Sequence, residues 1–513
     1  MISVFLGWMT GLALLLYSAS TVVLRSSARF LERARGPVEL KLPRGDVATP
    51  LDTLLDPLEA ANPGLDGIAN VLENTDAFAV RALTATEAGR SLDLIYYIWS
   101  TDLTGWQLLA DIMAAADRGV RVRLLLDDVN VQGFDLAFLA MNQHPNVQVR
   151  LFNPIRNRGH WVRRGMEFVL GLSRFNRRIH GKVWIADGRV AVLGGRNVGD
   201  TYFGATAAGA RNAHDADVIL IGPKVADVED VFDSYWNLGL SLPILTLWPR
   251  FKINMRRFRK KLARRSANTK ARRYRIEALA GRDAAQVLTE RLRWTDNVEV
   301  LADPPEKALG QRVGPWLSDT LTEAIAAAQH EVRLITPYFV PGAEGLAVLS
   351  DLAKRGVQVR LLTNSLASTD LFAVHGAYST YRAPLLAAGA QLYEYAPPRN
   401  GTSKRDLLHT KIFLFDGKTA IVGSHNFDLR SWNINIELGL RFDQPEMVAE
   451  LMAMFDKDIA PHCAYSVTQQ GRRLVWTSER GGKTVQDWTE PEAGTTRLLT
   501  AFLIGKLPLH RHF

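Results

Sequence analysis

The chain has 513 residues, of which 47% are hydrophobic and 22% charged, and this globular composition excludes a largely disordered protein. A single cysteine, Cys463, excludes an intramolecular disulfide framework and any multi-cysteine zinc or iron–sulfur site. The net charge of +9 indicates an anionic partner, either nucleic acid or an acidic membrane surface.

The N-terminal segment, residues 1–24, contains no charged side chain. As a helix it would reach about 36 Å, enough to cross a hydrocarbon layer of about 30 Å. Positive charges follow it, beginning at Arg25, which places the rest of the chain on the cytoplasmic side. Small residues at 18–20 leave a cleaved signal peptide as the alternative. We predict a single-pass membrane anchor over 1–24 and a basic linker over 25–66.

The chain repeats itself at an offset of 237 residues, since residues 118–127 resemble residues 355–364. Each copy reads as a helix end with a glycine, followed by a short apolar strand, and another apolar strand precedes each helix. This strand–helix–strand order indicates parallel βαβ units. We predict an α/β fold with two homologous lobes, 67–249 and 286–462, each a mixed, mostly parallel β-sheet flanked by helices.

A second repeat, at an offset of 229 residues, carries chemistry. Each copy reads His-x-Lys, four intervening residues, Asp, six more residues, and then Gly-Gly-Arg-Asn or Gly-Ser-His-Asn. The first copy comprises His180, Lys182, Asp187, Gly195 and Asn197, and the second comprises His409, Lys411, Asp416, Ser424 and Asn426. The same residue types at matching spacing in two related halves indicate one functional constellation that occurs twice.

The repeated residue types suit a phosphate diester. Because residues two apart share one face of a strand, His180 and Lys182 point the same way, as do His409 and Lys411. The two lysines would offset the phosphoryl charge, and the amides of the two motif asparagines would donate hydrogen bonds to its oxygens. One neutral histidine can attack phosphorus, while the other, protonated, gives a proton to the leaving alcohol.

A nucleophilic histidine needs an acceptor that holds its second ring nitrogen. Asp215 lies 35 residues after His180, and Glu437 lies 28 residues after His409, each next to an apolar strand. We predict that each carboxylate orients the histidine of its own half, with Asp217 as the reserve in the first half.

The remaining titratable residues are assigned to structure. The motif aspartates Asp187 and Asp416 follow their strands, so we expect them to fix the turn or to bind backbone. Residues 127–128 could imitate a metal site, but no further ligands stand at a suitable spacing, and we predict no metal and no cofactor. Five other histidines lack any motif and are expected to be structural or surface residues: His144, His160, His330, His375 and His462.

The positive charge is concentrated in residues 250–275, which hold 13 Lys/Arg and no acid, so that without them the net charge falls from +9 to −4. Apolar residues at 251, 255, 258 and 262 form one stripe on this basic helix. We predict that 250–285 is a basic amphipathic segment on an anionic membrane, with a nucleic-acid patch or a solvated linker as alternatives. The C-terminal tail, 463–513, holds a strand and a short apolar helix and is expected to pack on the body.

In its two motifs the chain resembles the phospholipase D superfamily, although Gly195 stands where many members have serine. Residues 194–203, 364–370 and 435–439 are similar to the bacterial cardiolipin synthase branch. The resemblance covers residues 68–490. It implies two lobes related by a pseudo-twofold axis, one shared active site, and a ping-pong reaction through a phosphohistidine that requires no metal.

The resemblance also implies roles and substrates. His180 would be the nucleophile and His409 the general acid and base. A phosphatidyl group from phosphatidylglycerol, or from phosphatidylethanolamine, would pass to a second phosphatidylglycerol at the bacterial inner membrane. A stripe of Phe168, Leu172 and Phe175 would then line a lipid entrance, or else pack in the core.

Three other functions remain as alternatives, because the same motifs would serve two of them. These are a phospholipase D-type hydrolase that releases phosphatidate, a membrane-tethered nuclease, and a lipid-binding scaffold without activity. Of these, the nuclease requires a nucleic-acid partner, which we regard as the less favoured partner. The sequence does not identify a protein partner.

Overall fold

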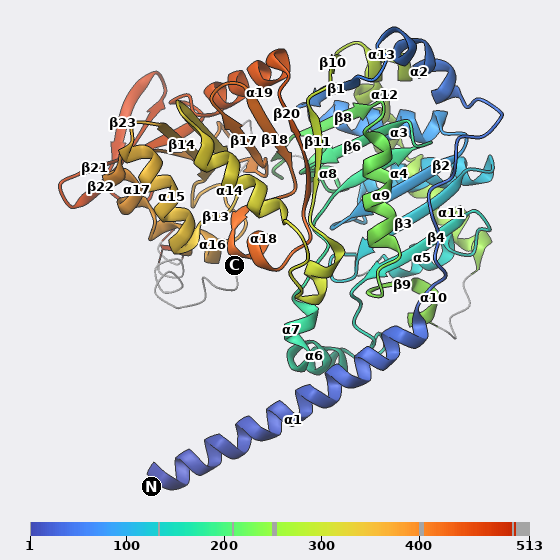
Figure 1. The fold of residues 1–513 in the computed structure, drawn as a ribbon, viewed down its shortest axis with the longest axis horizontal. Coiled ribbons are helices and arrows are strands. Elements are labelled where there is room, and N and C mark those ends of the chain that lie inside the picture. The colour runs from blue at the N-terminus through green and yellow to red at the C-terminus, as the bar shows by residue number, and fades with distance from the viewer. Residues whose placement is uncertain are drawn as a thin grey trace.

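The computed structural model describes residues 2–131, 134–207, 210–248, 254–399, 405–494 and 497–498. Two α/β lobes lie side by side, with the first half of the chain in one and the second half in the other (Figure 1). The predicted two-lobed α/β fold is therefore confirmed.

The first lobe is built on a nine-stranded sheet with the order β10-β1-β8-β6-β5-β2-β3-β4-β9. Its strands are β1 (Asp66–Val71), β2 (Ser91–Tyr96), β3 (Arg121–Asp127), β4 (Val147–Phe152), β5 (Val183–Ala186), β6 (Val190–Gly194), β8 (Asp217–Ile221), β9 (Ser241–Pro243) and β10 (Arg293–Thr295). Most of these strands are buried along their whole length, which matches their continuous apolar runs.

The second lobe repeats this arrangement in a ten-stranded sheet with the order β11-β20-β18-β17-β12-β14-β15-β21-β22-β23. Its strands are β11 (Val298–Ala302), β12 (Glu331–Ile335), β14 (Gln358–Asn364), β15 (Gln391–Tyr395), β17 (Ile412–Phe415), β18 (Thr419–Gly423), β20 (Leu438–Phe442), β21 (Ala464–Gln470), β22 (Arg473–Arg480) and β23 (Lys483–Asp487). The last three come from the C-terminal tail, which extends the edge of this sheet, as expected for its strand. The predicted apolar helix at 498–507 lies almost wholly outside the described residues.

Parallel pairing is less common than predicted. It is confined within the two large sheets to β2-β3-β4 and β12-β14-β15, while the other neighbours run antiparallel. The reason lies in the connections, because a helical crossover returns a strand in parallel whereas a tight turn reverses it. Both motif strands, β5 and β17, enter such turns, at Asp187-Gly188 and Asp416-Gly417, where all four residues have positive φ.

Helices cover both faces of the sheets. Those of the first half are α2 (Pro50–Ala61), α3 (Asn74–Glu87), α4 (Leu103–Asp117), α5 (Asp135–Met141), α6 (Trp161–Leu170), α7 (Leu172–Phe175), α8 (Asp200–Phe203), α9 (Val225–Trp236), α10 (Ile244–Leu247), α11 (Met255–Ser266), α12 (Thr269–Leu279) and α13 (Ala284–Thr289). Those of the second half are η1 (Pro305–Leu309), α14 (Leu317–Ala327), α15 (Gly342–Lys354), α16 (Phe372–Ser379), α17 (Arg382–Ala388), α18 (Leu429–Asn433) and α19 (Pro445–Asp458).

One hydrophobic core joins the two lobes. It combines residues of the first sheet and α9 with residues of the second sheet and α19, for example Val218 and Phe232 with Leu440 and Val448. Two short parallel strands also cross the boundary, β7 (Ala213–His214) and β16 (Leu407–Leu408). The shared core and the shared strands hold the two lobes in a defined relative position.

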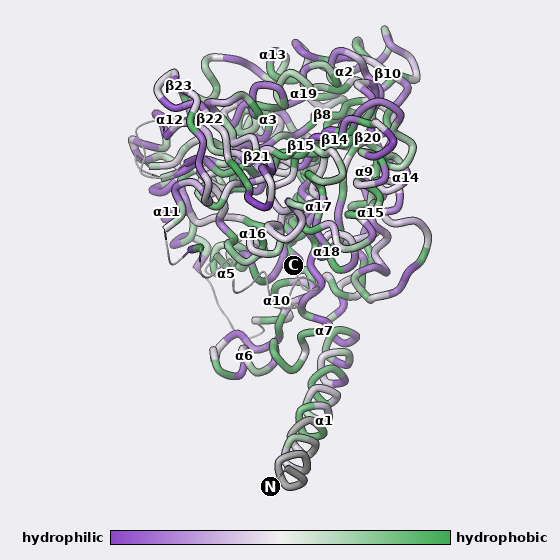
Figure 2. Tube along the Cα trace, turned by 90° about the vertical axis from the view of Figure 1, so that its left-hand side faces the viewer, coloured by the Kyte–Doolittle hydropathy of each residue, from purple (hydrophilic) through white to green (hydrophobic). Residues whose placement is uncertain are grey.

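The N-terminal helix, α1 (Ile2–Ala34), runs unbroken through the predicted boundary at residue 24 and projects from the body (Figures 1 and 2). Among the described residues, no helix combines the length and the apolar character needed to cross a membrane. The side chains of residues 1–7, 10, 12 and 13 lie outside the described part. The predicted single-pass anchor therefore has no support from the structure.

The predicted interfacial stripe of 250–285 faces the protein instead. Phe258 and Leu262 of α11 are buried in the core of the first lobe, where α11 packs on α4, and Met255 is partly buried beside them. Residue 251 lies outside the described residues. The spacing of the stripe was correct, but periodicity alone does not say which surface it covers, so the membrane-facing assignment of this stripe is wrong. The segment belongs to the first lobe.

Candidate active site

The two motif histidines lie where the lobes exchange backbone hydrogen bonds. The amide of His180 donates to the carbonyl of Ile436 at 2.8 Å, and the amide of His409 donates to the carbonyl of His214 at 2.8 Å. Each histidine is therefore hydrogen-bonded to a residue of the other lobe that is followed directly by a carboxylate, Glu437 after Ile436 and Asp215 after His214.

These backbone hydrogen bonds bring each predicted carboxylate to a histidine, but to the histidine of the other lobe and not to that of its own. His180 Nδ1 lies 2.8 Å from Glu437 Oε2, and His409 Nδ1 lies 2.5 Å from Asp215 Oδ2. The prediction that each carboxylate orients the histidine of its own half is wrong. The backbone hydrogen bonds between the lobes place the carboxylate of one lobe beside the histidine of the other. In both pairs Nδ1 is engaged, which leaves Nε2 for a substrate.

The third predicted acceptor, Asp217, has a different role. Its carboxylate accepts a hydrogen bond from Arg81 at 2.9 Å and from the amide of Arg196 at 3.2 Å, with all three residues buried. Asp217 therefore fixes the loop that follows β6 rather than a histidine.

Burial sets the protonation of the pairs. It lowers the pKa of His180 to about 4, against the opposing pull of Glu437. Burial and Lys411 also lower the pKa of His409, against the pull of Asp215. Although burial opposes it, the neighbouring His180 lowers the pKa of Glu437 to about 2. At neutral pH the free enzyme thus presents a neutral His180 backed by an anionic carboxylate, the state that a nucleophile needs.

The two motif lysines are also buried beside the histidines. Lys182 Nζ donates to the carbonyl of His180 at 2.5 Å, and Lys411 Nζ lies 3.1 Å from His409 Nδ1. Burial and then Lys411 lower the pKa of Lys182, to about 7 in spite of Glu437, and burial lowers the pKa of Lys411 to about 8. The ammonium group of Lys411 acts on that of Lys182, and two buried cations that interact in this way favour an anionic ligand at the site.

Ser424 and Gly195, which stand at the same position of the two motifs, have different roles. Ser424 Oγ donates to Glu437 Oε2 at 2.5 Å and accepts from the amide of Leu438 at 3.0 Å, so it orients the carboxylate. At Gly195 an added Cβ would lie 2.1 Å from Asp215 Oδ1. The carboxylate of Asp215 thus occupies the space that a serine side chain would take.

The motif asparagines are both buried. Asn197 Oδ1 accepts from the amide of Ile98 at 3.0 Å, and its Nδ2 donates to Tyr202 Oη at 3.2 Å. Asn426 is also buried, and its Oδ1 has no hydrogen-bond partner among the described residues. Asn197 is thus held by protein groups, so its predicted amide donation to phosphate requires a shared or exchanged hydrogen bond, and it remains a prediction.

The motif aspartates have the structural role expected of them. Asp187 accepts hydrogen bonds from the amides of Gly89, Arg90 and Ser91. Asp416 accepts in the same way from the amides of residues 329–331. Each carboxylate ties its hairpin turn to the chain that enters the neighbouring strand, and thereby fixes the start of the sheet.

Two tyrosines of the site were not predicted. The ring of Tyr97 meets His180 edge-on with centroids 4.8 Å apart, and the ring of Tyr202 meets His409 at 5.2 Å. Tyr97 directly follows β2, so that the end of this strand lies beside His180. Tyr202 belongs to the segment that resembles the cardiolipin synthase branch, so its position there was the available signal.

Two residues that the sequence assigns to structure, His375 and Asp128, contact arginines. The one group of the described residues with a metal-like geometry, His375, Glu394 and Glu490, surrounds the guanidinium of Arg382. An arginine already supplies the positive charge there, so the group does not suit a metal ion. Asp128 similarly accepts from Arg158.

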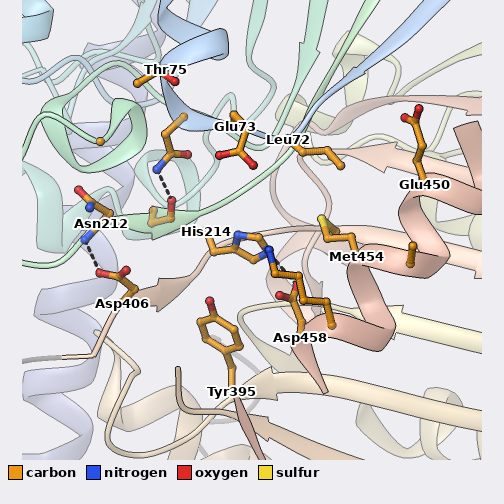
Figure 3. Close-up of a pocket in the computed structure, with 15 residues that line it drawn as sticks. Leu72, Glu73, Thr75, Asn212, His214, Tyr395, Asp406, Glu450, Met454 and Asp458 are labelled. Carbon is orange, nitrogen blue, oxygen red and sulfur yellow. Dashed lines mark hydrogen bonds and ion pairs between the residues drawn. The ribbon is translucent and has the colours of Figure 1, made fainter. Parts of the chain in front are cut away.

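A cavity of about 730 Å³ lies between the lobes, next to strand β7 (Figure 3). His214 lines it, stacks on Tyr395, and pairs through Nε2 with Asp458 Oδ2 at 2.7 Å. This cavity holds neither motif histidine, so it is distinct from the catalytic pair, although the carbonyl of His214 holds the amide of His409.

Two imidazoles with free Nε2 atoms, each backed by a carboxylate and accompanied by a buried lysine, define a site for phosphodiester chemistry at an interface between two homologous lobes. Residues 83–236 and 321–459 match the family described as cardiolipin synthase, PLD-like domain. The chain belongs to this cardiolipin synthase family of phospholipase D-like enzymes, which are phosphatidyltransferases.

Individual relatives agree with this assignment. The chain is 36% identical to cardiolipin synthase C of Escherichia coli (strain K12) over 88% of this chain and 97% of that protein. It is 26% identical to cardiolipin synthase A of Serratia proteamaculans (strain 568), over 84% of this chain and 77% of that protein. The crystal structure of phosphatidylserine synthase from Haemophilus influenzae Rd KW20 shares the fold, with a TM-score of 0.55 at 12% identity, over 80% of this chain and 91% of that one.

Proposed function

We propose that this enzyme makes cardiolipin by transferring a phosphatidyl group to phosphatidylglycerol through a phosphohistidine. The observation that carries the proposal is the crossed pair of histidine–carboxylate contacts, which engages Nδ1 of each histidine, while the motif lysine of each half also acts on the histidine of the other half. The cardiolipin synthases among the relatives support the choice of product.

In the first half-reaction, His180 Nε2 attacks the phosphorus of the donor lipid, and the bond from phosphorus to the headgroup oxygen breaks. Glu437 stabilises the positive charge that develops on the His180 ring. His409 gives a proton to the leaving alcohol, which departs as glycerol or ethanolamine. His409 has a lowered pKa in the free enzyme, and the anionic phosphodiester raises its proton affinity when it binds.

In the second half-reaction, the free hydroxyl of a phosphatidylglycerol attacks the phosphorus of the phosphohistidine. His409 now takes the proton of that hydroxyl, and the bond between phosphorus and His180 Nε2 breaks. Lys182 and Lys411 offset the charge on the phosphoryl oxygens in both steps. Because both half-reactions use the same groups, the enzyme returns to its starting protonation state.

The proposed site of action is the inner membrane surface of a bacterium, since both substrates are lipids of a bilayer. The donor is phosphatidylglycerol or phosphatidylethanolamine, and the alcohol released by the first half-reaction distinguishes them.

The test uses purified protein with vesicles that contain phosphatidylglycerol, with and without phosphatidylethanolamine. We expect cardiolipin from the wild type and none from His180→Ala or His409→Ala, measured by mass spectrometry of the lipids. The co-product, glycerol or ethanolamine, identifies the donor.

Trapping separates the two histidines. A short-chain diester that reacts but is transferred slowly should leave a phosphorylated peptide that contains His180 in the wild type, and none in His180→Ala. A phosphorylated His409 would reverse the two roles. Phosphatidate without cardiolipin would contradict the transferase and indicate the hydrolase instead.

A further inference from the structure

Helix α6 is amphipathic in the reverse sense. Its one acidic residue, Glu167, is buried and accepts hydrogen bonds from the amides of Arg156 and Asn157. Four of its apolar residues are exposed, among them Trp161 at 84% and Val169 at 69%. A helix on the surface of a soluble protein normally turns its apolar side to the core, so this orientation implies an apolar environment outside the protein.

The stripe predicted at the lipid entrance is distributed differently. Phe175 is buried and Phe168 stacks on it, whereas Leu172 is 46% exposed. The outward apolar residues of α6 are Trp161, Val162, Met166 and Val169 instead. The inner pair packs as core, and these four residues with Leu172 form the exposed apolar face.

This face continues onto α1, which lies beside α6 in both views (Figures 1 and 2). Ser20 Oγ of α1 donates to the carbonyl of Leu170 at 2.6 Å and ties the two helices together. Exposed apolar side chains of α1, including Leu14, Leu15 and Tyr17, add to the apolar surface.

A cationic groove of about 400 Å³ follows along α1. Arg25, Arg29 and Arg33 stand at successive turns of the helix, and Arg156 closes the groove with its guanidinium over the ring of Phe30. Among the described residues, no acidic side chain lines the groove. Guanidinium groups without acidic neighbours match phosphate groups, which they bind through paired N–H donors.

We propose that the exposed apolar face of α6 and the cationic groove of α1 together form a docking surface for an anionic phospholipid bilayer. The side chains of Trp161, Val162, Met166 and Val169 enter the boundary between headgroups and acyl chains, and Arg25, Arg29 and Arg156 bind lipid phosphates. An apolar face bordered by a cluster of arginines is typical of a helix at an anionic membrane surface. A protein partner would need acidic groups that match the groove.

The surface is connected to the catalytic histidine, and this part of the inference rests on the proposed function. Asn153 Nδ2 donates to the carbonyls of Arg174 and Arg177, at 2.9 Å each, and so fixes the segment between α7 and His180. Helix α7 joins this segment to α6. Docking through α6 therefore holds the active site at the level of the lipid headgroups.

The first test measures binding in a His180→Ala background, so that no lipid turns over. Full-length protein is sedimented with phosphatidylcholine vesicles that contain or lack phosphatidylglycerol. We expect Met166→Asp with Val169→Asp, and separately Arg25→Glu with Arg29→Glu, to lower partitioning to the anionic vesicles by about tenfold. Added salt should weaken the wild type but should matter less for the arginine variant.

Matched controls lie on α11 and α12, which are separate from α6 and α1 (Figure 1). Ile276→Asp replaces a residue of α12 that is 72% exposed, and Arg264→Glu with Arg265→Glu changes exposed charges of α11. We expect these controls to bind like the parent protein. Equal losses in all variants, or no loss in the α6 and α1 variants, would overturn the proposal. It would also be overturned if the α6 and α1 variants lost self-association but still bound vesicles.

A second measurement reports insertion itself. Because Cys463 is the single cysteine, Cys463→Ser with Val169→Cys gives one site for an environment-sensitive dye. We expect a blue shift with anionic vesicles at position 169 and none for a dye at position 276, and an unshifted dye at 169 would refute insertion. If the proposed reaction were wrong but docking correct, binding and blue shift would persist while no cardiolipin formed.

If docking were wrong but the proposed reaction correct, the α6 variants would make cardiolipin from vesicles as fast as the wild type. Turnover of a soluble short-chain diester by the same variants, with His180 intact, should stay within about twofold of the wild type, because none of these residues contacts the catalytic groups. A similar loss on the soluble and vesicle substrates would show damage to the site instead.

Discussion

At the scale of single residues, the two halves of the site perform one task with different side chains. The carboxylate of Glu437 accepts from Ser424 Oγ and from Ser431 Oγ at 2.8 Å, and the backbone amide of Glu437 donates to Asp303 Oδ2. Asp215 has no serine at the matching position, and instead sits against Gly195. The repeat therefore conserves the position of each carboxylate relative to the opposite histidine, rather than the bonds that hold it.

The first prediction follows from this contrast. Gly195→Ser should lower kcat/KM by roughly two to four orders of magnitude, because a Cβ would displace Asp215 and release His409. Ser424→Ala is the matched change, and it should cost about tenfold to a hundredfold, since Glu437 keeps its other donors. Both are measured with a soluble short-chain diester. A Gly195→Ser enzyme as active as wild type would contradict the assigned packing.

The second prediction concerns pH. Lys182 and Lys411, with pKa values of about 7 and about 8, are ammonium ions below those values and neutral above them. We therefore expect kcat/KM to fall as the pH rises through 7 to 8, because the site loses charge that binds the phosphate. Lys411→Arg, whose charge persists, should shift the decline upward even if its maximum is lower. A flat wild-type profile from pH 6 to 9 would refute this explanation.

At the scale of elements, the motif hairpins are tied to the chain that enters the neighbouring strand. Asp187 and Asp416 each accept three backbone amides, and both adopt the left-handed conformation that asparagine and aspartate tolerate. The aspartate of the motif is thus a stabilising residue of the fold, at the far end of the strand from the histidine.

The third prediction tests that role. Asp416→Ala should lower the free energy of unfolding by about 1–3 kcal/mol, since three amides lose a charged acceptor, while Asp416→Asn should lose less. Thermal unfolding measures both. The kcat of the remaining folded enzyme should stay close to the wild-type value, whereas a loss of kcat without a loss of stability would give the aspartate a catalytic role.

At the scale of the whole molecule, what could be predicted was local. The motif strands, the Asp-Gly turns and the repeated βαβ order follow from spacing within about 30 residues. The exchange of carboxylates between lobes could not be predicted in this way, because Glu437 and His180 are 257 residues apart and come together only when the two lobes pack on each other. The prediction that the apolar stripe of α11 faces a membrane was wrong for a related reason. The helical period reveals which side of a helix is apolar but not what that side packs against.

The lobes must stay in register for the site to exist, and one titratable contact at their boundary reports on that register. His214 of β7 pairs with Asp458 of α19 beside the interlobe cavity (Figure 3). Burial opposes protonation of His214, but Asp458 outweighs it and raises the pKa of His214 above its usual 6.5. Arg196 and Asp215 are the other charged groups that act on it.

The fourth prediction follows from the sign of that shift. A raised pKa in the folded state means that the charged pair adds stability below the unfolded pKa and loses it as the pH rises through the folded value. His214→Gln keeps a donor toward Asp458 but cannot titrate, so it should cost about 1–2 kcal/mol at pH 6 and less at pH 9. Unfolding of both proteins across this range measures the difference. A difference that does not change with pH would mean that the pair is uncharged.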